Sequence, residues 1–214
     1  MKKEFEKRIL SSLILIPVSF FFIIKGSFFF DFFLIICLAI TLYEWHMMSK
    51  KKKHYPFGIL FLILSFYTAY LFREASLWTF LFIIIICIST DMGGYILGKL
   101  LKGPKLTKIS PNKTYSGLIG GYIFSIIFMN IFLNYSYLLN LKKIEFDMMI
   151  FIIVILVSSF SQVGDIIISY FKRLSKIKDT GKIIPGHGGI LDRVDGMIFA
   201  FPFSYLIYLL EILK

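Results

Sequence analysis

The sequence predicts an all-α fold: a polytopic helical membrane protein with about seven transmembrane helices and a cytoplasmic N-terminus. Hydrophobic residues make up 57% of its 214 residues, and the mean hydropathy is +0.80, far above the values of soluble globular domains. The hydrophobic residues form runs of about 20, the length at which one helix crosses the hydrocarbon core of a bilayer. Basic residues are distributed between these runs in the alternating way that sets membrane topology.

Seven apolar segments follow one another along the chain. The first, residues 9–24, comes after a basic opening, and the Lys25, Gly26 and Ser27 behind it lack the small-residue cleavage pattern of a secretory signal. We therefore expect an uncleaved first span. Cys37 and Cys87 lie inside two later segments, and we interpret both as buried thiols rather than as a disulfide. The other six segments are residues 28–45, 56–72, 75–97, 117–139, 148–171 and 196–213.

The net charge of +11 is concentrated on one side of this topology. With the N-terminus inside, nineteen of the 24 Lys and Arg residues fall in residues 1–8, 46–55, 98–116 and 172–195. Such a bias predicts that these four segments face the cytoplasm. A cationic membrane face suits anionic lipid headgroups or an acidic substrate, and we expect no nucleic-acid partner.

The segment 169–195 contains most of the candidate functional residues. It lies between the last two apolar segments, yet it has six basic residues and three aspartates. Its second half combines Pro185 with glycines, a histidine and an Asp-Arg-x-Asp cluster that ends at Asp195. We interpret the segment as the cytoplasmic half of a nucleotide and metal site. The prediction thus divides the chain into N-terminal transmembrane helices, residues 1–90, and a catalytic transmembrane region, residues 91–214.

Two aspartates, Asp91 and Asp165, lie within apolar segments. A charge there is costly, and it normally faces a bundle interior, a water-filled cavity or a partner. Ser161, Ser169 and Lys172 stand at helical spacing around Asp165, which predicts one polar stripe toward the cytoplasmic end of the helix. A structural pairing with a neighbouring helix is the alternative for both aspartates, and it is stronger for Asp91.

Asp192 and Asp195 are three residues apart, so on a helix they share one face. Magnesium prefers oxygen ligands, usually one or two carboxylates together with substrate phosphates and water. Asp165 at the foot of one helix, with Asp192 and Asp195 at the head of the next, therefore predicts a metal site. The alternative is helix capping, which needs only one of the two aspartates.

Phosphate groups have candidate partners in the same segment. Glycines let the backbone approach a phosphate closely and turn its N–H groups inward, and cations neutralise the phosphate charge. The candidates are Gly186, His187, Gly188, Gly189, Lys172, Arg173, Lys178 and Arg193. A weaker signal precedes the fifth span, where Lys113 and Thr114 supply a cation and a hydroxyl. Four further glycines fit the spacing that lets membrane helices pack closely: Gly94, Gly98, Gly117 and Gly121.

Together these residues form a long gapped motif that resembles the phosphatidate cytidylyltransferases, or CDP-diacylglycerol synthases. The positions that match the C-terminal motif of that family are Ser169, Lys172, Arg173, Lys178, Asp179, Gly181, Pro185, Gly186, His187, Gly188, Gly189, Asp192, Arg193 and Asp195. Three upstream segments are also similar: residues 91–95, residues 110–114, and residues 164–165. The resemblance is specific over the last two thirds of the chain and general over the first three spans. Two positions depart from the pattern, since Ser116 stands where a glutamate is usual and Gly196 where a serine is common.

The resemblance implies transfer of a cytidylyl group from CTP to phosphatidic acid, which gives CDP-diacylglycerol and pyrophosphate in phospholipid biosynthesis. It implies Mg²⁺ as cofactor, with a second cation such as K⁺, a homodimer, and a bacterial cytoplasmic membrane location with the active site toward the cytoplasm. Catalytic roles are then expected for Asp165, Lys172, Arg173, Asp192 and Asp195, with metal binding by Asp165, Asp192 and Asp195. Substrate binding is expected for Asp91, Lys113, Lys178, Asp179, Gly186, His187, Gly188, Gly189 and Arg193.

Three other classes of protein share part of the pattern. CTP-dependent polyprenol or phytol kinases transfer the γ-phosphoryl group and release CDP, so product analysis separates them from a cytidylyltransferase. CDP-alcohol phosphotransferases require Ala-Arg where this chain has Phe199 and Ala200, which excludes them. An ion-coupled transporter with Asp91 and Asp165 on its path is the remaining alternative, although transporters commonly have internal repeats and no convincing repeat is found.

Overall fold

A computed structural model of the chain describes residues 2–107, 110, 113–139, 144–186 and 188–210. The regular elements in this part are helical, apart from two isolated β-bridges in loops. They are α1 (Lys2–Lys25), α2 (Ser27–Ser49), α3 (Tyr55–Ala75), α4 (Leu77–Leu101), α5 (Tyr115–Tyr135), the short 3-10 helix η1 (Ser136–Leu139), α6 (Met148–Leu174), α7 (Leu191–Val194) and α8 (Met197–Leu209). The prediction of an all-α fold is confirmed.

Each of the seven predicted apolar segments coincides with a helix, although not all of these helices have the length of a membrane span. Within the described residues, α2, α3, α4, α5 and α6 are long and apolar enough to cross a membrane. The apolar part of α1, Leu13–Lys25, and helix α8 are shorter. Five candidate spans support a polytopic membrane protein, and the count of seven stays a prediction.

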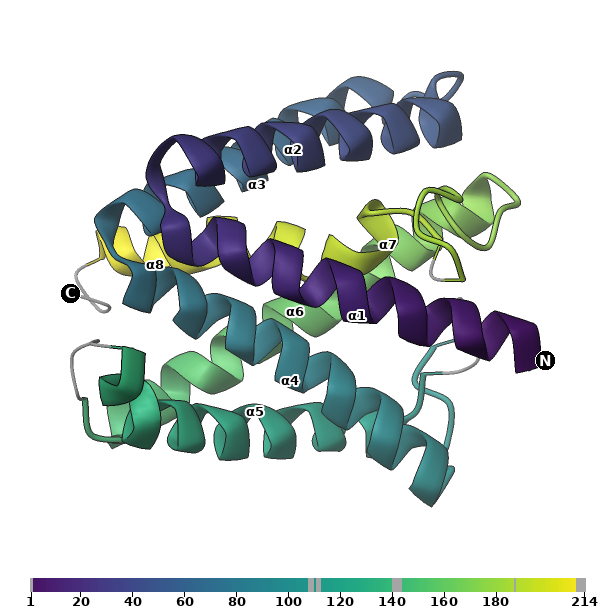
Figure 1. Cartoon of the computed structure of the whole chain (residues 1–214). Coiled ribbons are helices and arrows are strands. Elements are labelled where there is room, and N and C mark those ends of the chain that lie inside the picture. The colour runs from purple at the N-terminus through teal and green to yellow at the C-terminus, as the bar shows by residue number, and fades with distance from the viewer. Residues whose placement is uncertain (1, 108–109, 111–112, 140–143, 187, 211–214) are drawn as a thin grey trace.

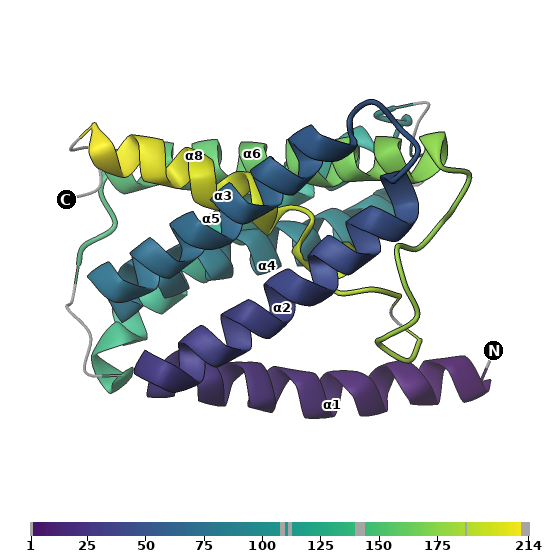
Figure 2. The ribbon, with the colours of Figure 1, turned by 90° about the horizontal axis from the view of Figure 1, so that it is seen from above.

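The helix ends gather at two opposite ends of the molecule. The N-terminus lies at one end, together with the loops that follow α2, α4 and α6 (Figures 1 and 2). The connections that follow α1 and α3 lie at the other end, as do the end of α5 and the end of α8. This is the arrangement that the alternating basic segments of the sequence require, because all four predicted inside segments come together.

Local polar residues set where three of the long helices begin. The Ser76 hydroxyl accepts the Trp78 N–H at the start of α4, and the Thr114 hydroxyl accepts the Gly117 N–H at the start of α5. At the start of α6 the Asp147 carboxylate accepts the Ile150 N–H at 2.8 Å. Such caps satisfy N–H groups that a helix start leaves without partners.

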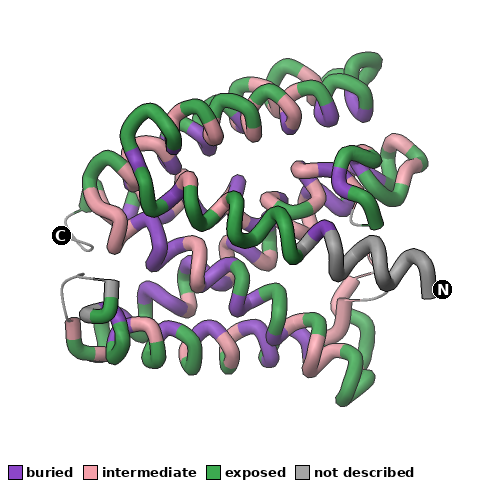
Figure 3. The backbone as a smooth tube through the Cα atoms, in the orientation of Figure 1, coloured by how far each residue is buried: buried purple, intermediate pink, exposed green. Residues whose placement is uncertain are grey.

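The core lies around α4 and α6, while the outer faces of the helices are apolar and exposed (Figure 3). Ile86 and Val157 are fully buried between these helices and their neighbours, whereas α5 exposes a stripe of isoleucines. In water such a stripe would be unfavourable, but lipid tails are as apolar as the side chains themselves. The stripe consists of Ile119, Ile123, Ile127 and Ile131.

Glycines bring α4 and α5 into backbone contact, as the spacing of Gly94, Gly98 and their partners predicts. The two backbones approach most closely beside those pairs, between Gly93 and Gly120. A methyl group on Gly93 would overlap the Gly120 carbonyl oxygen, and one on Gly120 would lie 2.6 Å from the Gly93 oxygen. At Gly94, in contrast, the nearest atom would be 3.6 Å away, an ordinary contact.

We predict that Gly93→Ala destabilises the fold and that Gly94→Ala on the same helix does not. Overpacking a tight contact costs about 1–3 kcal/mol, because α5 has to move away from α4. Reversible unfolding of the two variants in mixed micelles measures the difference directly. Equal stability of Gly93→Ala and the unsubstituted chain would show that the two helices do not meet in this register.

Candidate active site

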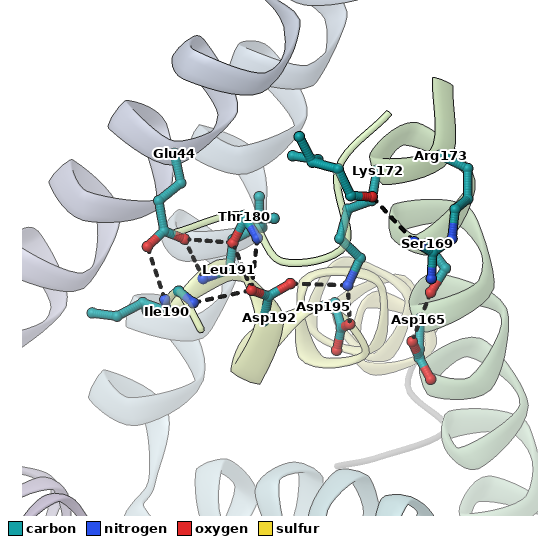
Figure 4. A network of polar contacts seen from close by, with 12 residues as sticks. Glu44, Asp165, Ser169, Lys172, Arg173, Thr180, Ile190, Leu191, Asp192 and Asp195 are labelled. Carbon is teal, nitrogen blue, oxygen red and sulfur yellow. Dashed lines mark hydrogen bonds and ion pairs between the residues drawn. The ribbon is translucent and has the colours of Figure 1, made fainter. Parts of the chain in front are cut away.

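A buried cluster of charges joins the end of α6 to α7. The Lys172 ammonium, in the last turn of α6, lies 2.9 Å from Asp192 Oδ1 and 3.9 Å from Asp195 Oδ2 (Figure 4). The side chains of Lys172 and Asp192 are 11% and 5% exposed. Three of the predicted catalytic residues therefore come together, with one cation between two carboxylates.

Asp192 also organises the loop that leads into α7. Its Oδ2 accepts the Thr180 N–H at 2.8 Å, the Thr180 hydroxyl at 3.0 Å and the Gly189 N–H at 3.0 Å. Burial by itself raises the pKa of Asp192, but the Gly189 N–H and the Lys172 ammonium outweigh it, so the pKa lies below its usual value. The carboxylate is accordingly ionised at neutral pH, and both of its oxygens have donors.

The loop also turns tightly just before α7. The Ile184 N–H donates to the Gly188 carbonyl at 2.9 Å, and the Ser11 hydroxyl on α1 donates to the Pro185 carbonyl at 3.1 Å. Gly186 and Gly188 have φ angles of 78° and 89°, which favour glycine. A methyl group on Gly188 would in addition lie 2.7 Å from Asp192 Oδ2.

Asp195 lies in a different environment from Asp192. It is 7% exposed, and its Oδ1 accepts the adjacent Gly196 N–H at 3.0 Å. Burial and then the neighbouring Asp165 carboxylate raise its pKa well above the usual value, and Asp91 contributes in the same direction. Asp91, Asp165 and Asp195 therefore concentrate negative charge in one region.

Asp165 links α6 to the segment before α5. Its Oδ2 lies 2.6 Å from the Lys113 ammonium, and its Oδ1 accepts the Ser169 hydroxyl at 3.4 Å. The side chains of Lys113 and Asp165 are 20% and 31% exposed, so solvent reaches this pair more than it reaches Lys172. The predicted polar stripe on α6 is present, and Lys113 joins it from another segment.

The other predicted site residues lie at the surface of the loop or nearby. Arg173 is exposed and donates to the Ile177 carbonyl at 3.2 Å, which closes the end of α6. Lys178, Asp179, Gly186 and Arg193 are exposed. His187 lies outside the described residues. Gly189, in contrast, is buried.

Glu44, a buried residue in the last two turns of α2, is not among the predicted site residues. It is 1% exposed, and its carboxylate accepts the Ile190 N–H at 3.0 Å and the Leu191 N–H at 2.8 Å. The Thr180 hydroxyl lies 2.9 Å from Glu44 Oε2. The rule that identified Asp91 and Asp165, a carboxylate within an apolar segment, applies equally to residue 44. The polar network therefore extends from the predicted catalytic region into residues 1–90.

The predicted metal ligands differ in how far protein donors occupy their oxygen atoms. Among the residues that the structure describes, no three His, Cys, Asp or Glu side chains are arranged around one metal position. Asp165 and Asp195 nevertheless provide hard oxygen atoms that lie close enough to interact electrostatically, and such ligands suit a divalent cation. Asp192 differs, because protein donors occupy both of its oxygens.

The chain is similar to known proteins over most of its length. The sequence model of the cytidylyltransferase family matches residues 6–76 and 56–211. The chain belongs to this family. Phosphatidate cytidylyltransferase of Rickettsia felis is 33% identical over 218 residues, which cover 98% of this chain and 94% of the relative.

For two further family members, the match with this chain covers less than two thirds of the relative's own length. Phosphatidate cytidylyltransferase of Staphylococcus saprophyticus is 36% identical over 78% of this chain, and the match spans 65% of the relative's length. The Bacillus subtilis enzyme of the same name is 40% identical over 60% of this chain and 47% of its own length. The cytidylyltransferase match thus covers the site and most of the helices.

We predict that Asp192→Asn loosens the loop. An asparagine retains one acceptor oxygen, so its amide N–H₂ must face either the Lys172 ammonium or the donors of Thr180 and Gly189. Hydrogen–deuterium exchange of residues 178–191 should accelerate about tenfold or more, since buried donors lose an acceptor. The matched control is Asp165→Asn, whose partners Lys113 and Ser169 lie outside this loop; equal exchange in the two variants would contradict the role of Asp192.

Proposed function

We propose that the chain transfers the cytidylyl group of CTP to phosphatidate, forming CDP-diacylglycerol and pyrophosphate. The main support is the convergence of Lys172, Asp192 and Asp195 beside the Asp165–Lys113 pair, at the end of the bundle where the basic segments gather. The names of the relatives support the choice of substrates.

The reaction needs charge neutralisation more than a strong base. A phosphate oxygen of phosphatidate attacks the α-phosphorus of CTP, the bond from that phosphorus to the oxygen bridging to the β-phosphate breaks, and pyrophosphate leaves. The attacking phosphate is already anionic at neutral pH. The obstacle is the mutual repulsion of two anions, which cations held in fixed positions reduce.

In this proposal the residues divide into two groups. Asp165 and Asp195 would hold Mg²⁺, which would neutralise phosphate charge, and a second cation such as K⁺ would bind in the same site. Asp192 holds the loop and Lys172 in place. The remaining cations and glycines contact the phosphates of CTP or of phosphatidate: Lys113, Arg173, Lys178, Arg193, Gly186 and Gly188, together with His187. Asp91 and Asp179 are the remaining proposed substrate-binding residues.

The proposed setting is the bacterial cytoplasmic membrane, with the site toward the cytoplasm. Its support is the positive charge at the end of the bundle that holds the N-terminus and the loop before α7. CTP is available on that side, while phosphatidate comes from the bilayer. We also propose that the chain has seven transmembrane spans and forms a homodimer.

Product analysis of the purified protein tests this function. Incubation with CTP, phosphatidate and Mg²⁺ should give equal amounts of pyrophosphate and CDP-diacylglycerol, and removal of Mg²⁺ with a chelator should stop the reaction. Formation of CDP from CTP with a polyprenol, and no pyrophosphate with phosphatidate, would assign the chain to the lipid kinases instead.

We predict that Asp165→Asn lowers turnover by roughly 100-fold, the scale on which loss of one electrostatic group affects a charged transition state. Glu74→Gln serves as the control and should retain full turnover. It removes an exposed carboxylate in the last turn of α3. Initial rates at saturating CTP and Mg²⁺ provide the comparison. Near-normal turnover of Asp165→Asn in folded protein would exclude Asp165 as a metal ligand.

A further inference from the structure

We infer that Glu44 is a positioning residue for the proposed reaction, which holds α7 from a distant helix so that Asp192 and Asp195 face Lys172. The effect on turnover rests on the proposed function, whereas the effect on the loop does not. Glu44 belongs to α2, so the N-terminal helices then form part of the active site.

Glu44 supplies the cap that α7 lacks. Helix α7 begins after Ile190, whose side chain provides no hydrogen bond to the helix start. The two oxygens of Glu44 accept the Ile190 N–H at 3.0 Å and the Leu191 N–H at 2.8 Å. Without Glu44 these two N–H groups would lose their acceptors. Capping residues usually precede their own helix, but this one is 146 residues away from Ile190 in the chain.

The loop has glycines at the points where it approaches Glu44. A methyl group on Gly189 would overlap both carboxylate oxygens of Glu44, and one on Gly181 would lie 2.7 Å from Oε1. The N–H of Gly189 is itself donated to Asp192. Close approach to Glu44 thus gives a physical reason for glycine at residues 181 and 189, where the sequence alone indicated a phosphate contact for Gly189.

Thr180 connects Glu44 to the catalytic cluster. Its hydroxyl lies 2.9 Å from Glu44 Oε2 and 3.0 Å from Asp192 Oδ2, between the two carboxylates. Its N–H donates to Asp192 as well, and Asp192 in turn binds Lys172. A continuous series of hydrogen bonds therefore runs from α2 to the end of α6 (Figure 4).

A second contact fastens the beginning of the same loop to the same helix. The Ser175 hydroxyl donates to the Met48 carbonyl at 2.8 Å, about one turn beyond Glu44 on α2. The loop is therefore attached to the end of α2 both where it leaves α6 and where it enters α7. A shift of α2 would move the two aspartates relative to Lys172.

Glu44→Gln is the direct test. The glutamine amide keeps one acceptor oxygen, so either the Ile190 N–H or the Leu191 N–H faces an N–H₂ group in place of an acceptor. Hydrogen–deuterium exchange of residues 178–191 should accelerate about tenfold or more, the KM for CTP should rise by a similar factor, and the KM for phosphatidate should stay within twofold. Glu74→Gln, an exposed glutamate on α3, should leave all three values unchanged. Unchanged loop exchange in Glu44→Gln overturns the inference.

Thr180 variants provide a second test that keeps α2 intact. Thr180→Val removes the hydroxyl and should reproduce the rise in the KM for CTP, whereas Thr180→Ser retains the hydroxyl and should restore the original value. If the residues act in series, Glu44→Gln combined with Thr180→Val costs no more than the larger single effect. If the two increases in the KM for CTP multiply in the double variant, Glu44 does not act through Thr180. Should the unsubstituted chain form no CDP-diacylglycerol, the proposed function fails, and the exchange data still decide the role of Glu44.

Discussion

The site depends on the hydrogen bonding of two buried carboxylates, Asp192 and Glu44. The loop between α6 and α7 has too few apolar residues to fold by burial alone, and its backbone N–H groups need acceptors. The two carboxylates accept the N–H groups of Thr180, Gly189, Ile190 and Leu191, and the Lys172 ammonium balances part of their charge. Removing either acceptor would leave several buried donors without partners at once.

This arrangement separates residues that hold the loop from residues that face the reaction. Asp192 and Glu44 have their oxygens occupied by protein donors, so they suit a structural task. Asp165 and Lys113 are more exposed, and Asp195 has few donors despite its burial. The proposed cytidylyl transfer requires such a division, because a site for two anionic substrates needs fixed cations and free oxygen ligands in one place.

The sequence allowed the helices and the cluster to be predicted, but not how the loop is held. Apolar runs locate the long helices because membrane length and hydrophobicity are local properties; residues 148–171, for example, became α6, Met148–Leu174. The motif also indicated that Asp165, Asp192 and Asp195 converge, but not that Lys172 lies between Asp192 and Asp195. Their spacing did not show that Asp192 holds the loop while Asp195 does not. The hydrogen-bond donors to Asp192 come from Thr180 and Gly189, whereas Asp195 accepts the Gly196 N–H. Nothing local connects residue 44 with residue 190, and α7 was not expected as a helix separate from α8.

A structure of the chain with a non-hydrolysable CTP analogue and Mg²⁺ would test the proposed site directly. We expect the triphosphate beside Lys113, Asp165 and Asp195, with Mg²⁺ on the two aspartates, while Glu44 and Asp192 keep their hydrogen bonds to the loop. A triphosphate bound at the opposite end of the helices, or Mg²⁺ on Glu44 with the loop released, would contradict it.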